Sequence, residues 1–365
     1  MNIALLPSAF YSDPTYHRVL SSLKREFARS GHRAIVISKE GLPSLARKTG
    51  ESEKPALPLY DRRLPGKKRR ALLIGALAER LSPGTVLNFH FSGWLRPWHA
   101  PVLLSERLAG ARLVVTFQDY CHPDLPPLTS ASRPAMRALL DRAHSVTAVS
   151  GFLSRMIARD FPSAAGKLRV IPNGADPCPA AGRRSCGNYI LTVGRQAPYK
   201  GLDLLLFALA DARGKGCDAG LVVCGAGENG PLRGLAEKLG IGDKVTFKGV
   251  VPPEEIGKLM KGCLFYATTP RWESFGMAAL EAMAAGKAVL ASRTGGLTEF
   301  ARDGITALLT APQDIGAISS AITRLCSDKG LRGSLGRNAA VTARAYSWKK
   351  IAAEYIRSAY GAPGL

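Results

Sequence analysis

The sequence predicts an α/β protein built from two doubly wound domains. Short apolar runs alternate with amphipathic helical segments along the chain, which is the pattern of parallel sheets covered by helices. A length of 365 residues suits two domains of ordinary size. Residues 177–187 are rich in proline, alanine and glycine and are typical of a linker. We therefore expect a first domain over residues 1–175 and a second over residues 176–345.

The first domain opens with a β-α-β pattern. Its predicted elements are a strand at 2–7, a helix at 19–30 and strands at 34–38, 85–90, 113–117, 144–150 and 167–172. Ligands of parallel sheets gather at the carboxyl ends of the strands, so His90, Gln118 and Asp119 are expected to face a binding cleft. His122 follows three residues later as a further candidate, although a lone loop histidine is more often an ordinary surface residue.

Residues 41–81 allow two interpretations. An irregular segment rich in proline and basic residues, with KKRR at 67–70, precedes an apolar helix at 71–81. A basic run directly before an apolar helix is typical of a segment that lies on a membrane surface. A buried helix behind a solvated loop explains the same pattern, and the sequence does not separate the two.

The second domain repeats the alternation. Its predicted elements are strands at 189–193, 220–224, 245–249 and 264–267 and a first helix at 201–212, and beyond its end at residue 345 a last amphipathic helix is expected at 348–360. The glycine-rich GAGENG at 225–230 follows a strand. Alone it is a weak signal, and we interpret it as a loop near a nucleotide.

The segment RWESFGMAALE at 271–281 organises the rest of the chain. A helix is expected from Met277 to a C-terminal glycine at Gly286. Glu273 and Glu281 therefore flank a helix start whose free N–H groups can bind sugar or phosphate oxygens. On a helix they would stand at most roughly 12 Å apart, which suits a sugar joined to a nucleoside diphosphate.

Four motifs follow one another along the chain: VIPNGAD at 170–176, GRQAPYKG at 194–201, the pair Glu273 and Glu281, and TGGLTE at 294–299. In this order they resemble the retaining glycosyltransferases of family 4 (GT4), which have a GT-B fold. The resemblance implies two Rossmann-like domains facing a central cleft. The first domain would bind the acceptor, the second the nucleotide sugar, and a C-terminal helix at 346–365 would cross back onto the first.

The resemblance also implies roles for individual residues. Arg195 and Lys200 would bind the pyrophosphate, Glu273 the transferred sugar, and Glu281 the ribose. The remaining expected donor-binding positions are Gly194, Gly225, Phe275, Gly276, Gly295 and Gly296. Two departures affect the acceptor side: residues 8–17 lack the glycine pair of the family, and Gln118 stands where many members have histidine. Whether His90, Gln118 or His122 takes over from that histidine stays open.

The expected chemistry needs no metal. A nucleoside diphosphate gains negative charge as it departs, and the cations of Arg195 and Lys200 can stabilise it. No second pair of carboxylates is evident for a double displacement, so same-face attack is favoured, with the leaving phosphate oxygen taking the acceptor's proton. The six histidines show no metal-binding spacing, and no cofactor besides the donor substrate is expected.

The amino-acid composition limits which binding partners and which cellular compartment are expected. A net charge of +22 favours anionic partners, such as the nucleotide substrate or an anionic membrane surface, although charge that only keeps the protein in solution explains the same excess. A specific nucleic-acid site is not expected, because no recognition motif accompanies the charge. The seven cysteines, an odd number without a C-x-x-C pair, indicate reduced thiols in a cytoplasmic protein. No apolar run approaches the ~20 residues that span a bilayer.

Three functions remain in competition. The first is a cytoplasmic, membrane-peripheral glycosyltransferase that builds a cell-surface glycan or a lipid-linked saccharide. The second is a non-hydrolysing nucleotide-sugar 2-epimerase of the same fold, which would need no acceptor. The third is an inactive basic binding protein. The base and sugar of the donor depend on pocket shape rather than on motifs.

Overall fold

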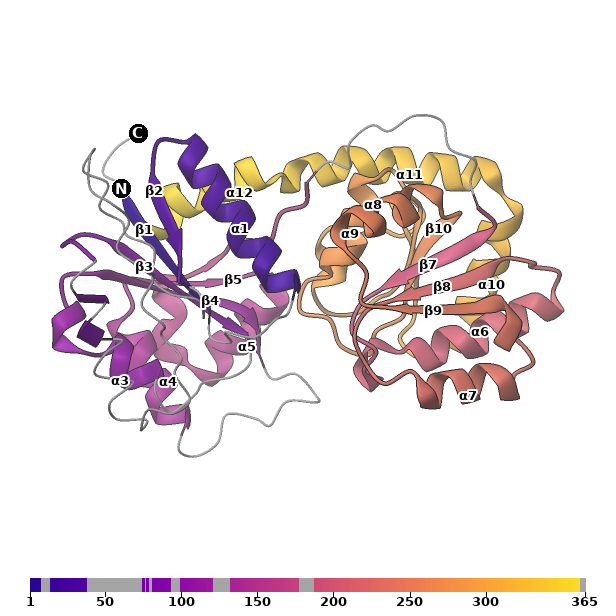
Figure 1. Cartoon of the computed structure of the whole chain (residues 1–365), viewed down its shortest axis with the longest axis horizontal. Helices are drawn as coiled ribbons and strands as arrows, with labels where there is room; N and C mark the ends of the chain where they lie inside the picture. Colours follow the sequence, from indigo (N-terminus) through magenta and orange to yellow (C-terminus); the bar gives the residue numbers. More distant parts are fainter. Residues whose placement is uncertain are drawn as a thin grey trace. The chain divides into compact units, whose positions relative to one another are not determined.

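The computed structural model describes residues 1–7, 14–37, 74–75, 77–78, 81–92, 99–120, 132–176 and 187–361 (Figure 1). The chain divides into two compact units, Met1–Asn173 with Trp348–Leu365, and Gly174–Ser347. Each unit holds a six-stranded sheet in which every described strand pair is parallel. The predicted α/β class with two doubly wound sheets is therefore confirmed. The expectations for residues 41–70, His122 and the linker up to residue 186 lie outside the described residues.

The first unit is built on the strand order β2-β1-β3-β4-β5-β6. Its strands are β1 (Asn2–Pro7), β2 (Arg33–Val36), β3 (Val86–Ser92), β4 (Arg112–Asp119), β5 (Ser145–Ala148) and β6 (Leu168–Val170). Its helices are α1 (Pro14–Arg29), α3 (His99–Leu103), α4 (Ser132–Arg142), α5 (Gly151–Asp160) and α12 (Trp348–Glu354). Helices α1 and α12 lie together on one face of the sheet, and α3, α4 and α5 lie on the other (Figure 1).

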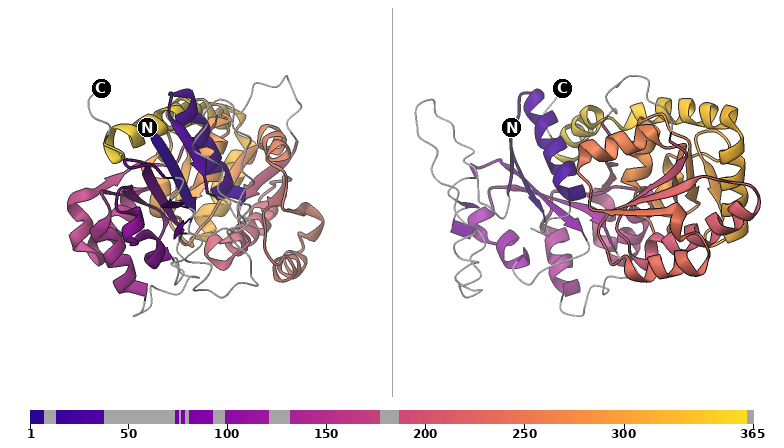
Figure 2. Two further views of the ribbon diagram at one scale, coloured as in Figure 1. Left: turned by 60° about the vertical axis from the view of Figure 1, so that its left-hand side comes forward. Right: turned by 45° about the vertical axis from the view of Figure 1, so that its right-hand side comes forward.

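The C-terminal segment is packed into the first unit beside α1 (Figures 1 and 2). After α12 the chain continues as a π-helical turn, Tyr355–Ala359. The buried Tyr360 follows, and its hydroxyl accepts a 2.8 Å hydrogen bond from Nδ2 of Asn88 on β3. The ring of Tyr360 lies 5.6 Å from that of Phe27 on α1. Aromatic packing and a buried hydrogen bond thus fasten the chain end to the sheet.

The second unit has the strand order β12-β11-β10-β7-β8-β9. Its strands are β7 (Tyr189–Val193), β8 (Gly220–Cys224), β9 (Val245–Gly249), β10 (Phe265–Thr268), β11 (Val289–Ser292) and β12 (Leu308–Thr310). Its longer helices are α6 (Leu202–Gly214), α7 (Gly230–Lys238), α8 (Pro253–Gly262), α9 (Met277–Ala284), α10 (Ile315–Ser327) and α11 (Lys329–Ala343). Figure 1 shows α6, α7 and α10 on one face of the sheet and α8, α9 and α11 on the other.

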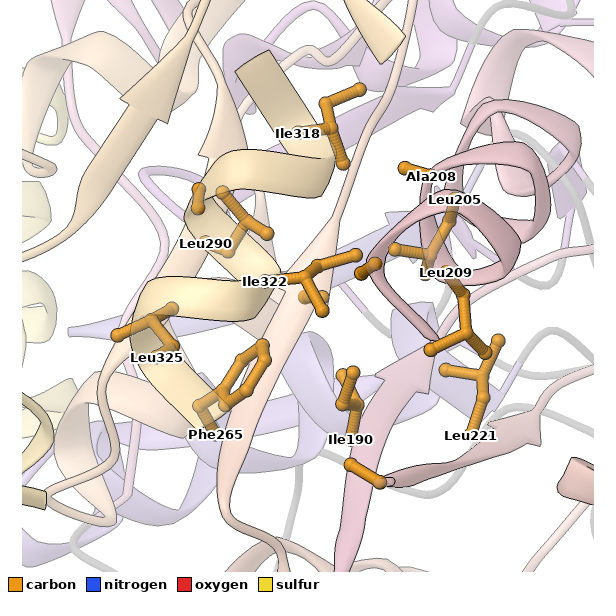
Figure 3. Close-up of a cluster of buried hydrophobic side chains, with 14 of the residues drawn as sticks. Ile190, Leu205, Ala208, Leu209, Leu221, Phe265, Leu290, Ile318, Ile322 and Leu325 are labelled. Atoms are coloured by element: carbon orange, nitrogen blue, oxygen red, sulfur yellow. The ribbon is translucent and has the colours of Figure 1, made fainter. Parts of the chain in front are cut away.

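The core of the second unit lies between its sheet and the helices α6 and α10. Figure 3 shows Ile322 of α10 and Leu209 of α6 directed toward Phe265 and Ile190 of the central strands. All four side chains are fully buried. Burying a side chain of this size stabilises the fold by roughly 1.5–3 kcal/mol, so this layer holds the sheet rigid beneath the loops at its carboxyl edge.

Some element bounds differ from the sequence-based expectation. Helix α1 begins at Pro14, five residues before the predicted start at residue 19. Strand β4 continues to Asp119, so Gln118 and Asp119 belong to the strand itself rather than following it. Pairing of Asp119 with Ser92 of β3 extends this strand, and such pairing depends on a neighbour that the local pattern does not reveal.

The expectation of reduced cysteines is wrong for one pair. The structure joins Cys217, which precedes β8, to Cys326 near the end of α10 in a disulfide, with Cα atoms 6.1 Å apart. Because 109 residues separate the two, their spacing does not indicate that they meet. Cys224 and Cys263 are buried thiols outside this disulfide, and Sγ of Cys263 donates to the backbone oxygen of Met260 at 3.1 Å.

Candidate functional site

The predicted donor-binding segments follow two neighbouring strands of the second unit. Strands β7 and β10 pair in parallel, and the strand order reverses between them because β8 and β9 lie on one side and β11 and β12 on the other. Ligands of open α/β sheets bind outside the carboxyl ends of strands at such a switch point. Residues 194–201 leave β7 there and residues 269–276 leave β10. The topology therefore brings both motifs to one edge of the sheet.

Lys200 and Glu273 meet at this edge. Nζ of Lys200 donates a 2.7 Å hydrogen bond to Oε2 of Glu273. The two side chains are 24% and 14% exposed, so the pair is largely shielded but still reaches the surface. The ammonium also lies 5.1 Å from the centre of the Tyr199 ring. A cation and a carboxylate held this close can bind a phosphate and a sugar hydroxyl next to each other.

The charges of both glutamates of the motif affect the pKa of Tyr266 on β10. Burial is the main cause that raises the pKa of the Tyr266 hydroxyl, and the negative charge of Glu273 and, more weakly, of Glu281 adds to it. The hydroxyl donates to the backbone oxygen of Val193 at the end of β7, at 3.2 Å. Glu273 and Glu281 are thus both within electrostatic reach of one buried phenol. Sequence pattern does not single out Tyr266, because a tyrosine within an apolar strand is usually a packing residue.

The backbone around Glu273 depends on glycines. The N–H of Gly296 donates to the backbone oxygen of Glu273 at 3.0 Å, and a Cβ at Gly295 would lie only 1.9 Å from that oxygen. Gly276 precedes α9 with a φ of 104°, a conformation that residues with a Cβ rarely adopt. The loop 295–296 and the start of α9 can therefore approach each other only because these positions lack side chains.

Phe275 is buried by its own neighbours. Its ring packs against Phe300 and Tyr346, with centroids 5.4 and 6.3 Å away, and the residue is only 3% exposed. The side chain therefore belongs to the core. A donor-binding role at this position would fall to the backbone N–H groups between Phe275 and the start of α9.

Two further glycines lie at the ends of β7 and β8. The N–H of Gly194 donates to Cys224, and that of Gly225 to Gly249, at 2.9 and 2.7 Å. A Cβ on Gly225 would lie 1.8 Å from the oxygen of Gly194, whereas a Cβ on Gly194 would meet no described atom within 4 Å. Gly225 is therefore needed for packing, and Gly194 faces open space. Arg195 follows Gly194 at the same edge, and it is exposed.

The candidates of the first unit form a buried chain of hydrogen bonds. Oε1 of Gln118 accepts from Nδ2 of Asn173 at 2.8 Å, and Nε2 of Gln118 lies 3.3 Å from Nδ1 of His90. An amide NH2 group only donates, so Nδ1 of His90 accepts and its ring proton is on Nε2. Within the described residues, Nε2 has no hydrogen-bond partner. Asn173, which belongs to the VIPNGAD motif, had not been singled out from the sequence.

His90 lies at the switch point of its own sheet. It pairs with Pro7 of β1, and the strand order reverses between β1 and β3. Burial lowers the pKa of His90 to about 3, so the ring is neutral at physiological pH and presents an N–H donor rather than a positive charge. Asp119 stands at the end of β4, where its Oδ1 accepts a 2.8 Å hydrogen bond from the backbone N–H of Tyr120.

The described residues contain neither a metal-binding cluster nor a membrane-spanning helix. No cluster of three or more His, Cys, Asp or Glu side chains there is arranged to hold a metal ion. Likewise, none of the helices in these ranges combines the length and the apolar character needed to cross a bilayer.

Family models match both halves of the chain. Residues 17–177 match the model "Glycosyltransferase Family 4", and residues 180–342 match "Glycosyl transferases group 1". The chain belongs to the group 1 glycosyltransferases of the family 4 type. The second model spans every residue proposed for the donor site, from Gly194 to Gly296.

Curated relatives of this family member are glycosyltransferases. A D-inositol 3-phosphate glycosyltransferase of Acidothermus cellulolyticus is 34% identical over 204 residues, covering 50% of this chain and 45% of that protein. One from Corynebacterium glutamicum is 27% identical, covering 72% and 67%. A GDP-mannose-dependent mannosyltransferase of Mycolicibacterium smegmatis is 31% identical, covering 63% and 65%. The chain thus spans between about half and two thirds of the length of these relatives.

Solved structures share the fold at low sequence identity. A glycosyltransferase of Rickettsia africae superposes with a TM-score of 0.76 at 17% identity, covering 98% of this chain and 97% of its own. The sucrose-phosphate synthase of Thermosynechococcus elongatus gives 0.73 at 21%, covering 98% of both chains. HepE of Anabaena, solved in complex with UDP-glucose, gives 0.70 at 18%, covering 98% of this chain and all of its own. These likenesses establish the GT-B fold.

Proposed function

We propose that this chain is a retaining, metal-independent glycosyltransferase that moves a hexose from a nucleoside diphosphate to a glycan or a lipid-linked acceptor. The observation that carries the proposal is the contact between Lys200 and Glu273 at the switch point of the second unit. The contact places the ammonium of Lys200, which can bind phosphate, beside the carboxylate of Glu273, which can bind sugar hydroxyls. The products would be cell-surface polysaccharides or glycolipids.

The proposed reaction uses charge rather than a metal ion. The bond between the anomeric carbon and the β-phosphate oxygen breaks, and the acceptor oxygen bonds to that carbon on the same face. The acceptor's proton passes to the departing phosphate oxygen. Lys200 and Arg195 stabilise the charge that develops on the diphosphate, which is the largest contribution that such a site can make. Glu273 holds the hydroxyls of the transferred sugar, and Glu281 holds the ribose.

The acceptor is assigned to the first unit in this proposal. His90 supports the assignment, because its buried Nε2–H donor lies at the carboxyl end of β3 and lacks a described partner. A neutral imidazole can donate to a sugar hydroxyl but cannot act as a general acid at neutral pH. Gln118 would then orient His90 instead of binding the sugar itself.

A thermal-shift screen against UDP-, GDP- and ADP-hexoses tests the donor, since a ligand that binds only the folded state raises Tm. The relatives named above suggest UDP-glucose and GDP-mannose as the first donors to try. Transfer is then followed by mass spectrometry of added acceptors, without metal and with EDTA. Formation of the C2 epimer from donor alone would indicate an epimerase instead. No stabilisation by any nucleotide sugar would contradict the proposal.

We further propose that the protein binds anionic membranes from the cytoplasmic side. Helices α1 and α12, which pack together, carry exposed basic residues, namely Lys24, Arg25, Arg29, Lys349 and Lys350. The carboxylate of α1, Glu26, is buried and accepts hydrogen bonds from Arg25 and Arg29. A surface of this charge is attracted to anionic headgroups with roughly 1 kcal/mol per basic residue near the surface.

Co-sedimentation with liposomes tests the membrane proposal. The variant Lys349→Glu with Lys350→Glu should bind vesicles containing phosphatidylserine more weakly than the wild type. Lys238→Glu with Lys258→Glu is the matched control, because both lysines are exposed on the second unit. Equal binding of the wild type to neutral vesicles would contradict the electrostatic attraction.

A further inference from the structure

A second ion pair joins the same two segments that carry Lys200 and Glu273. Asp203 lies in the first turn of α6, three residues after Lys200, and Arg271 lies two residues before Glu273. The guanidinium of Arg271 binds the carboxylate with both arms, at 2.8 Å from Nη1 to Oδ1 and 2.7 Å from Nη2 to Oδ2. Such a planar, two-armed contact fixes orientation as well as distance.

Arg271 also holds the residues directly before Lys200. Its Nη1 donates to the backbone oxygen of Pro198 at 2.7 Å, and its backbone N–H donates to the oxygen of Tyr199, also at 2.7 Å. One residue of the β10 segment thus binds the chain on both sides of Lys200.

Thr269 adds a buried contact on the same side. Its hydroxyl donates to the backbone oxygen of Gly201 at 2.7 Å. A Cβ on Gly201 would lie 2.0 Å from the oxygen of Thr269, so the two backbones are in direct contact. The residue after Lys200 is therefore fixed to the β10 segment as well.

The remaining nitrogen of Arg271 is also engaged. Its Nε lies 3.4 Å from Oε1 of Gln313, a residue with a φ of 65° in the loop between β12 and α10. A non-glycine residue in this left-handed region is uncommon and is often found at functional positions. Lysine could supply the charge of Arg271 but not this set of directed contacts.

A contribution to folding stability does not by itself explain the two-armed ion pair between Arg271 and Asp203. The side chains of Arg271 and Asp203 are 31% and 35% exposed, and ion pairs this exposed contribute little to stability. Burial by itself would raise the pKa of Asp203, but the hydrogen bond and charge of Arg271 outweigh it and hold that pKa below its ordinary value. The carboxylate thus stays charged at neutral pH and keeps its partner.

We propose that Arg271 and Asp203 are positioning residues for sugar transfer, which hold the segments of Lys200 and Glu273 so that both charges meet the donor in a fixed geometry. This inference rests on the proposed function, because it takes Lys200 and Glu273 to contact the donor. Displacing a group that binds the reacting centre by about 1 Å can cost on the order of a hundredfold in rate.

Two conservative variants test the pair. Arg271→Lys keeps the positive charge but loses the two-armed contact of the guanidinium. Asp203→Asn keeps the size of the side chain but loses its negative charge. We expect each to lower kcat by roughly ten- to a hundredfold, with a decrease in Tm of no more than about 4 °C. Asp218→Asn is the matched control, since Asp218 forms an exposed 3.4 Å pair with Arg213 in the same unit. It should keep kcat within about twofold of the wild type.

A double-mutant cycle separates positioning from a general structural effect. The measured quantity is the Kd of UDP or GDP, whichever stabilises the wild type. Asp203→Asn should weaken binding in the wild-type background but add little in the Lys200→Ala background, because the lysine that it positions is gone. A general loss of structure would weaken both backgrounds by the same factor and would overturn the inference.

The outcomes also separate this inference from the proposed function. If Arg271→Lys and Asp203→Asn keep wild-type kcat while Lys200→Ala loses it, the pair does not position the site, although the proposed function stands. If Lys200→Ala itself keeps wild-type turnover and Kd, the proposed function fails.

Discussion

Nζ of Lys200 lies 2.7 Å from Oε2 of Glu273, although 73 residues separate them in the chain. The lysine comes from the loop after β7 and the glutamate from the loop after β10. Parallel pairing of these two strands is what brings the loops together. The contact gives the second unit a partly shielded pair of opposite charges at the point where open α/β sheets bind ligands.

Replacing Lys200 by alanine tests its role directly. We expect turnover to fall by roughly two to three orders of magnitude, because the departing diphosphate loses a fixed cation. Single-turnover kinetics with saturating donor measure the effect. Lys258→Ala, an exposed lysine on α8, is the control. Wild-type turnover in a folded Lys200→Ala protein would refute the role of the lysine.

Two glycine substitutions should separate donor binding from folding. A Cβ on Gly194 would meet no described atom within 4 Å, so Gly194→Ala should leave Tm nearly unchanged. If the donor approaches this backbone, the methyl group should weaken nucleotide-sugar binding by at least about tenfold, which corresponds to ~1.4 kcal/mol. Isothermal titration calorimetry measures the Kd. Unchanged affinity would exclude close approach at Gly194.

Gly295→Ala should instead damage the fold. The added Cβ would lie 1.9 Å from the backbone oxygen of Glu273, and the φ of 53° is unfavourable for alanine. We expect the free energy of unfolding to fall by about 2–4 kcal/mol. Urea denaturation checks this value. Wild-type stability in this variant would mean that the loop can move away from Glu273 without cost.

His90 predicts a specific response to acid. Burial lowers its pKa to about 3 in the folded protein, while the unfolded chain has the ordinary value near 6.5. Below pH 6.5 the unfolded state therefore binds a proton that the folded state does not bind. Stability should fall by up to ~1.4 kcal/mol per pH unit from this residue as pH decreases toward 3, and should not depend on it above pH 6.5.

The variant His90→Gln isolates this contribution. Urea denaturation of both proteins between pH 4 and 8 should give a shallower loss of stability for the variant below pH 6.5. Above pH 7 the two curves should run parallel. Parallel curves over the whole range would mean that His90 takes up a proton equally in both states.

Tyr360 should be important for the stability of the first unit. Its hydroxyl accepts the 2.8 Å hydrogen bond of Asn88 in a fully buried place. Tyr360→Phe would leave the amide of Asn88 without this acceptor, so the free energy of unfolding should decrease by about 1–3 kcal/mol. Tyr346→Phe is the control, because its hydroxyl makes only an exposed 3.5 Å contact with Glu299. Calorimetry compares the two. Equal stabilities would show that the buried hydrogen bond contributes nothing net.

Several strands of the second unit were predicted from the local sequence pattern. The runs at 189–193 and 220–224 match β7 and β8, because inner strands of a parallel sheet are short, mostly apolar and bounded by polar or glycine residues. The run at 245–249 matches β9, an edge strand in which buried and more exposed residues alternate. Gly286 was expected to end the helix that begins at Met277, and its φ of 72° is the left-handed conformation typical of a glycine after a helix. Local pattern predicted the element bounds of the first unit less well. Strand β4, for example, runs on to Asp119 because Ser92 of β3 pairs with that residue.

By itself, the sequence determined the fold class, the family and the residue types available at the edge of each sheet, because helix and strand periodicity, glycine positions and motif spacing are local properties. Only the tertiary structure decided which side chains meet. The fork between Asp203 and Arg271 spans 68 residues, and the disulfide between Cys217 and Cys326 spans 109. Gln118 bonds to Asn173 and His90 for the same reason. Such contacts depend on strand order and loop path, which no stretch of sequence contains.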